Sequence, residues 1–153
     1  MAVKAKVMKA KVPDRLRRQM VLPVPRKLVW RALTDPEQLA GWFCNQAELD
    51  LRPGGAVLFD FGGGEQASAE IEKADPERRL AFRWQPAGDD PATTLVQFTL
   101  EEVPRGTRLT LTESGFAALP EDVRERAFLD NEWGWDEELG ELRSYFRVPT
   151  PRL

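Results

Sequence analysis

The stretch AVLFDFGGGEQASAEIEKADPERRLAFRW, residues 56–84, determines the fold, because apolar residues alternate along it and tight turns interrupt it. Val57, Phe59 and Phe61 are two residues apart, which places their side chains on one face of a strand. Three glycines follow at 62–64. The residues on both sides of them are typical of strands, so they favour a hairpin turn over a phosphate-binding loop. The stretch therefore predicts an antiparallel meander.

The same alternation continues beyond this stretch in both directions. Short turns that contain proline or glycine separate most of the apolar runs, and no internal repeat or long linker interrupts them. The predicted strands cover residues 16–24, 47–51, 57–61, 66–73, 80–84, 96–100 and 109–111. We therefore expect an α+β domain in which a curved antiparallel sheet of six to seven strands wraps around a helix.

Three other segments have the apolar spacing of helices. Residues 26–34 carry one apolar face, and a second short helix then begins with Asp35 as its cap and Pro36 as its first residue. The last segment, residues 120–147, is a long C-terminal helix. It places Trp133 on its outer side and an apolar stripe on the side that faces the sheet. The stripe consists of Phe128, Trp135, Leu139, Leu142 and Phe146.

Size and charge restrict the classes of protein to which the chain can belong. Its 153 residues are 42% hydrophobic and 31% charged, which suits one globular domain. We place this domain at residues 14–148, between a basic tail at 1–13 and a short tail at 149–153. The net charge of −3 argues against nucleic-acid binding. No run of about 18 apolar residues is present, so we expect no membrane span.

The cysteine and histidine content limits the chemistry. A single cysteine, Cys44, excludes an internal disulfide and fits a reducing, cytoplasmic location. Histidine is absent, which excludes a Ser-His-Asp triad and a histidine-ligated metal site. We expect neither a metal nor another cofactor. Acid–base catalysis would have to use carboxylates, lysine, arginine-assisted water or Tyr145.

Eight aromatic residues are expected near the space between the sheet and the last helix. Each ring can simply fill the core, but together they also suit a pocket for a small apolar ligand. We predict that this pocket is lined by Trp30, Trp42, Phe59, Phe61, Phe82, Trp84, Phe98 and Trp135.

Glu113 is the best single candidate for a catalytic carboxylate. It has the same parity along its strand as Leu109 and Leu111, so we expect its side chain to point inward. A buried carboxylate needs Arg83, Arg108 or a similar donor, or else it stays protonated.

Several short motifs occur in a fixed order along the chain. They are VWRALTDPE at 29–37, Trp42-Phe43, DLRPGG at 50–55, PERRL at 76–80 with Phe82 and Trp84, TRLTLT at 107–112, and Gly134-Trp135 with Leu139 and Leu142. Over about residues 15–147 this order resembles the START-like helix-grip (SRPBCC) superfamily. Within it, the chain is similar to the family named for homologues of the heat-shock chaperone ATPase activator. The resemblance implies a cavity between the sheet and the last helix.

The resemblance leaves several functions open, because the superfamily includes lipid and hormone carriers, polyketide cyclases and antibiotic-sequestering proteins. Relatives often have histidine at the position of Glu113, so a role of that imidazole does not carry over. The motif of the chaperone-binding domain of the eukaryotic activators is absent. We expect non-catalytic binding of a small apolar or aromatic molecule in the cavity.

Two alternatives remain. The first is a polyketide cyclase or hydrolase-like enzyme that uses an inward carboxylate such as Glu113. The second is a protein-interaction module, either chaperone-related in the stress response or a homodimer, for which Trp133 and the basic tail provide the contacts.

Overall fold

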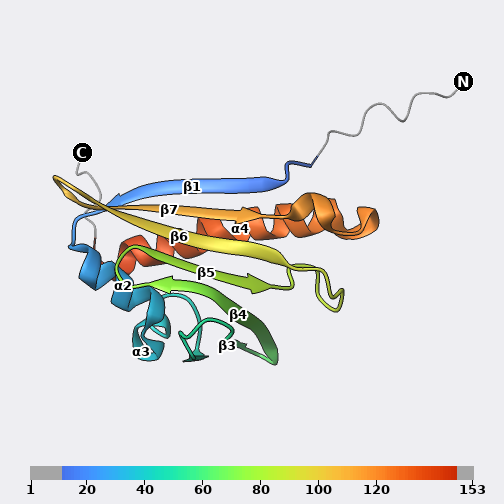
Figure 1. Cartoon of the computed structure of the whole chain (residues 1–153), viewed down its shortest axis with the longest axis horizontal. Helices are drawn as coiled ribbons and strands as arrows, with labels where there is room; N and C mark the ends of the chain where they lie inside the picture. Colours follow the sequence, from blue (N-terminus) through green and yellow to red (C-terminus); the bar gives the residue numbers. More distant parts are fainter. Residues whose placement is uncertain (1–11, 148–153) are drawn as a thin grey trace, which may run out of the picture.

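The computed structural model of the protein describes residues 12–147. The C-terminal tail predicted at 149–153 and nearly all of the basic tail predicted at 1–13 lie outside the described residues. Figure 1 shows one twisted sheet, with the long helix α4 (Glu121–Tyr145) along one face and the short helices α2 (Arg26–Thr34) and α3 (Pro36–Leu39) at one end. In the part of the chain that the structure describes, no helix is long and apolar enough to cross a membrane.

Seven antiparallel strands form the sheet. In the order of the sheet they run β1-β7-β6-β5-β4-β3-β2, so the strands from β2 to β7 form a continuous meander and β1 pairs with the last strand. The predicted strands and their antiparallel arrangement are confirmed. Their bounds are β1 Arg15–Leu22, β2 Gln46–Leu49, β3 Ala56–Gly62, β4 Glu65–Asp75, β5 Arg79–Trp84, β6 Thr94–Val103 and β7 Gly106–Ser114.

The helices also begin and end close to the predicted positions. They are α2 Arg26–Thr34, α3 Pro36–Leu39, the short 3-10 helix η1 Phe116–Ala118 and α4 Glu121–Tyr145. Asp35 caps α3 by accepting a hydrogen bond from the backbone N–H of Glu37 at 3.0 Å. Pro36 occupies the first turn of α3, where its missing N–H costs nothing.

Trp42 fixes the corner formed by α2 and α3. Its indole Nε1–H donates to the backbone carbonyl of Ala32 in α2 at 2.8 Å. Phe43 follows it and is also buried, so both rings lie in the core beneath the sheet. This corner brings Phe43 next to the middle of α4, where its ring stacks on that of Trp135.

Helix α4 turns its apolar stripe toward the sheet. Phe128, Trp135, Leu139 and Leu142 are buried, as predicted, and Trp133 is 68% exposed on the outer side. Phe146, which was predicted to belong to this stripe, packs against the core. It lies just after the last helical residue, is only partly buried and packs its ring edge-on against Tyr145. At the edge of the sheet, Arg18 of β1 pairs with Glu132 and Asp136 of α4.

Candidate functional site

A buried carboxylate lies at the centre of the interface between the sheet and α4. Glu113 stands near the end of β7, and its side chain is fully buried. It continues the row formed by Leu109 and Leu111, which are also buried, so the inward direction predicted from parity is confirmed. In the sheet Glu113 lies between Leu16 of β1 and Val96 of β6.

Four side chains from three elements donate hydrogen bonds to this carboxylate. The indole Nε1–H of Trp84 in β5 and the hydroxyl of Thr94 in β6 donate to Oε2, at 2.9 and 2.5 Å. The indole Nε1–H of Trp135 in α4 donates to Oε1 at 2.8 Å. The Asn131 amide of α4 lies 3.0 Å from Oε1 and 2.9 Å from Oε2. Because a carboxylate is an acceptor only, this set of donors satisfies it without a cation.

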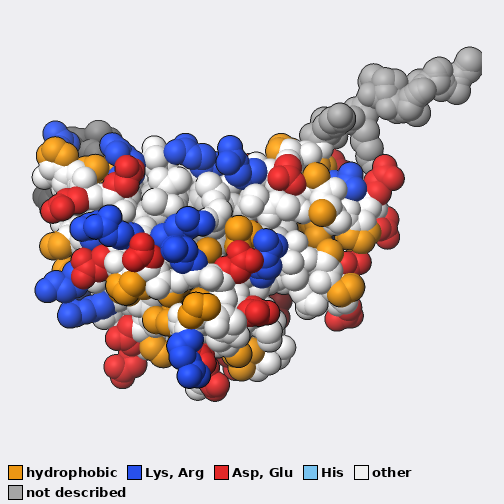
Figure 2. Space-filling model, viewed as in Figure 1, with side chains coloured by type: hydrophobic (Ala, Val, Ile, Leu, Met, Phe, Trp, Pro, Cys, Tyr) orange, Lys and Arg blue, Asp and Glu red, His pale blue; other side chains and the backbone are white. Residues whose placement is uncertain are grey.

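The arginines expected to pair with Glu113 do not reach it. Arg83 donates to Glu72 at 2.7 Å, and Arg108 faces Glu101 at 3.6 Å. Both arginines precede or follow inward residues on their strands, so alternation turns them to the outer face. Figure 2 shows Lys or Arg and Asp or Glu side chains intermingled over this face. Glu113 does have donors, as expected of a buried carboxylate, but they are not the two arginines that were named.

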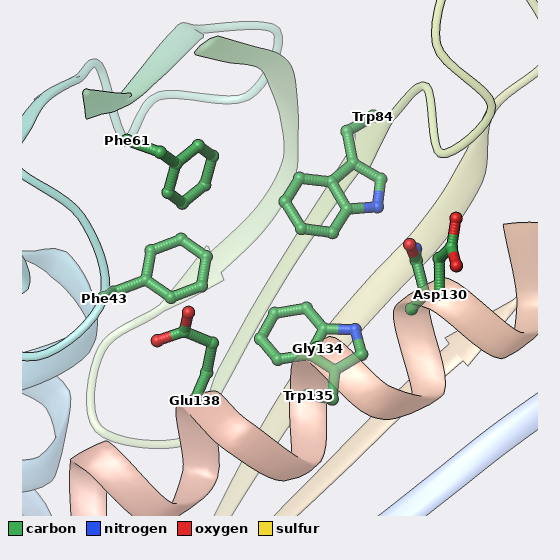
Figure 3. Close-up of a pocket in the computed structure, with 8 residues that line it drawn as sticks. Phe43, Phe61, Trp84, Asp130, Gly134, Trp135 and Glu138 are labelled. Atoms are coloured by element: carbon green, nitrogen blue, oxygen red, sulfur yellow. The ribbon is translucent and has the colours of Figure 1, made fainter. Parts of the chain in front are cut away.

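Beside the carboxylate, a small cleft opens between the sheet and α4. It has a volume of about 140 Å³, and we call it the ring cleft. Figure 3 shows the rings of Phe43, Phe61, Trp84 and Trp135 on its walls and the Glu138 carboxylate next to them. The residues that line it are Phe43, Phe61, Trp84, Asp130, Asn131, Gly134, Trp135 and Glu138.

The aromatic walls of the ring cleft are packed against one another. Trp135 stacks on Phe43 with ring centroids 5.8 Å apart and on Trp84 with centroids 5.6 Å apart. Phe61 meets Phe43 edge-on at 5.4 Å. Because both indoles also donate to Glu113, the two largest rings are fixed by packing and by hydrogen bonds. The cleft thus has a preformed wall.

A second pocket, which is bordered by buried core rings, is almost filled. Only about 10 Å³ remains there, which is room for at most one water molecule. The predicted rings Trp42, Phe59, Phe82 and Phe98 border this space and form core. Trp30 is partly buried and lines neither space.

The eight predicted rings are thus divided between core and cleft. Phe61, Trp84 and Trp135 meet at the ring cleft, whereas the other five do not line it. The sequence reasoning missed Phe43, Asn131 and several polar members of the cleft. The one available signal was spacing, because Asn131 lies one helical turn before Trp135 and so shares its face. The binding role of the eight rings remains a prediction.

Glu138 is a titratable residue in the wall of the ring cleft. Burial, and after it the nearby Glu141 and Glu137 carboxylates, together raise the pKa of its carboxyl to about 7. Cys44, which is buried nearby, has its pKa raised to about 11, first by burial and then by Glu138 and Asp60. Cys44 therefore stays a thiol near neutral pH and behaves as a small buried hydrophobe.

Replacing Glu138 by glutamine is expected to stabilise the protein at alkaline pH. The ionised carboxylate costs the fold free energy, and this cost is absent below the ordinary pKa of 4.5 and complete above about pH 7. Glu138 is partly exposed to solvent, which weakens the effect of its charge on stability. We therefore expect Glu138→Gln to add about 1 kcal/mol to the free energy of unfolding at pH 8. Urea denaturation at pH 4.5 should show little difference. An equal gain at both pH values, or the same gain in Glu125→Gln, an exposed control on the same helix, would contradict this result.

Comparisons with known proteins show which family the chain resembles. A family model described as activator of Hsp90 ATPase homolog 1-like protein matches residues 23–147. No match was found among curated proteins. Several solved structures are similar. Protein MLL2253 from Mesorhizobium loti is 24% identical, with a TM-score of 0.77 over 89% of this chain and 99% of that chain.

Two other solved structures share the fold. DynU16, a protein in the dynemicin biosynthetic locus, is 29% identical, with a TM-score of 0.76 over 92% of this chain but only 49% of that chain. The Aha1 dimer from Colwellia psychrerythraea is 19% identical, with a TM-score of 0.70 over 90% of this chain and 98% of that chain. The fold is therefore the helix-grip fold predicted from the motifs. By the match over residues 23–147, the chain belongs to the family of activator of Hsp90 ATPase homolog 1-like proteins.

Proposed function

We propose that the chain reversibly binds a small molecule whose flat apolar part enters the ring cleft. The observation that carries this proposal is the cleft itself, with four rings held in place around a volume of about 140 Å³. A cavity of about 150 Å³ lined by apolar side chains accepts benzene, so the ring cleft suits one aromatic ring. A larger ligand would leave its remaining atoms outside, toward solvent. The position of DynU16 in a biosynthetic locus is consistent with a small-molecule ligand.

Glu113 acts in this proposal as a positioning residue. It is fully buried, and it is not among the residues that line the ring cleft. Its two oxygens hold the indoles of Trp84 and Trp135 in one orientation, together with the amide of Asn131. Rings that are already fixed lose little conformational freedom when a ligand binds, which favours affinity.

A titration with phenol tests this proposal directly. For a ligand of this size we expect a dissociation constant on the order of 1 mM. Phe61→Ala removes one wall of the ring cleft and should weaken phenol about tenfold. Trp30→Ala, which removes a partly buried ring outside the cleft, is the matched control and should bind phenol as the native protein does. Equal affinity for phenol in the native protein and in Phe61→Ala would place any binding site elsewhere.

Self-association is a second candidate function, and the outer side of α4 favours it. Trp133 is 68% exposed and Leu129, one turn earlier on the same side, is 52% exposed. Two copies of the chain could bury this pair symmetrically, and a similarly folded Aha1 protein was solved as a dimer. Sedimentation over a roughly hundredfold concentration range should show weak association that Trp133→Ala abolishes. A native protein that is monomeric at every concentration would exclude this function.

A further inference from the structure

The charges around the ring cleft all have the same sign. Asp130 and Glu138 are the ionisable groups among the residues that line it, and neither lysine nor arginine lines it. A second hollow of about 460 Å³ shares Phe43, Phe61 and Glu138 with the cleft and also contains Glu65 and Glu141. The cleft and this hollow are therefore both lined by carboxylates and by no lysine or arginine, so an anionic ligand would be repelled.

The rings themselves favour a positive charge. The face of an aromatic ring is electron-rich and attracts cations, most strongly in tryptophan. In the ring cleft both indole N–H groups donate to the buried carboxylate of Glu113. A hydrogen bond to an anion pushes electron density toward the donor ring, so Trp84 and Trp135 present more negative faces than isolated indoles would.

No ion pair of the described residues neutralises Asp130 or Glu138, and Arg126 lines a separate hollow together with Asp130. Among the described residues, the ion pairs formed by arginine involve other carboxylates than Glu113, Asp130 and Glu138. The donors around Glu113 are all neutral. A ligand that brings its own positive charge would complete the charge balance of the site.

We propose that the ligand of the ring cleft is an organic cation, a substituted ammonium whose apolar groups contact the four rings while Glu138 balances its charge. This proposal rests on the proposed function and adds the chemical class of the ligand. Aromatic cages with an acidic member are suited to ammonium groups that carry several carbon substituents, because the charge is spread over a surface that rings can contact. A volume of about 140 Å³ suits a group of that size.

Binding of the cation should strengthen as Glu138 ionises. Its pKa is raised to about 7 by burial and by Glu141 and Glu137, so a cation in contact with it favours the ionised form. Affinity is then expected to rise several-fold between pH 6 and pH 8. The other titratable groups that border the cleft or the adjoining hollow are Asp130, Cys44, Glu65 and Glu141. The thiol of Cys44, with its pKa near 11, stays neutral in this range.

Two probes of the same shape separate charge from size. Phenyltrimethylammonium and tert-butylbenzene differ in one atom, nitrogen for carbon, and hence in charge. Calorimetric or NMR titration should give an affinity about tenfold or more higher for the cation. Glu138→Gln should remove most of this preference and the pH dependence with it, while leaving the affinity for tert-butylbenzene nearly unchanged.

Each outcome decides between the two proposals. If tert-butylbenzene binds as tightly as the cation, the charge inference is wrong and the proposed function stands. If neither probe binds, both are wrong. A cation can also gather at surface carboxylates, because the chain carries a net charge of −3. Gly134→Leu, which fills the ring cleft, must therefore abolish binding of the cation; if binding persists in that variant, the inference is overturned.

Discussion

Replacing Glu113 by alanine should lower the free energy of unfolding by about 3–5 kcal/mol, because it removes a fully buried acceptor to which four side chains donate. The indole N–H groups of Trp84 and Trp135, the hydroxyl of Thr94 and the amide of Asn131 would be left without their partner. Glu113→Gln has nearly the same shape but turns an amide donor toward other donors. We expect it to cost about 2 kcal/mol.

Urea denaturation at neutral pH measures these differences. Thr112→Ala is the matched control on the same strand, because Thr112 is the neighbour of Glu113 and alternation turns it to the other face. It should cost less than about 1 kcal/mol. If Glu113→Ala were no more destabilising than Thr112→Ala, the carboxylate would not hold the sheet and α4 together as described.

Filling the ring cleft from Gly134 should abolish binding without unfolding the protein. Gly134 lines the cleft, and a Cβ added to it would meet no atom within 4 Å. Leucine there would occupy the space that the ligand needs, so Gly134→Leu should weaken phenol at least about a hundredfold. In the interior of a helix, leucine is also more favourable than glycine by about 1 kcal/mol. The variant should therefore be at least as stable as the native protein.

Gly140→Leu is the control for this variant. Gly140 lies on the same helix and is exposed, and a Cβ added to it would also meet no atom within 4 Å, but it does not line the ring cleft. It should keep the native affinity for phenol. A Gly134→Leu protein that still binds phenol at native strength, while remaining folded, would remove the ring cleft as the binding site.

The fold could be predicted from local pattern, because alternation of apolar residues indicates the inward face of each strand, and glycine and proline indicate the turns. Val57 and Phe59 are buried as their spacing requires, and Gly62, Gly63 and Gly64 all have positive φ in the turn between β3 and β4. The pairing of β1 with β7 joins segments about 90 residues apart in the sequence. It was not predicted, because no local feature specifies which edge of the meander the first strand joins.

The candidate site could be predicted only in part. Parity gave the direction of Glu113, but its donors come from three elements that are distant in the sequence, and Arg83 and Arg108 are not among them. The residues that line the ring cleft were harder to predict than the direction of Glu113. A ring such as Phe59 that fills the core and a ring such as Phe61 that lines the cleft have the same strand parity. They differ only in how much space the facing helix leaves, which depends on tertiary packing.

The five tryptophans provide the most direct test of the central claim that a small molecule binds in the ring cleft. Each indole N–H gives its own signal in a proton–nitrogen NMR spectrum, so one titration with phenol reports on all five positions. The account predicts that the signals of Trp84 and Trp135 shift saturably. The signals of Trp30, Trp42 and Trp133 should stay in place. A spectrum in which Trp84 and Trp135 do not move, or in which only the exposed Trp133 responds, would contradict the account.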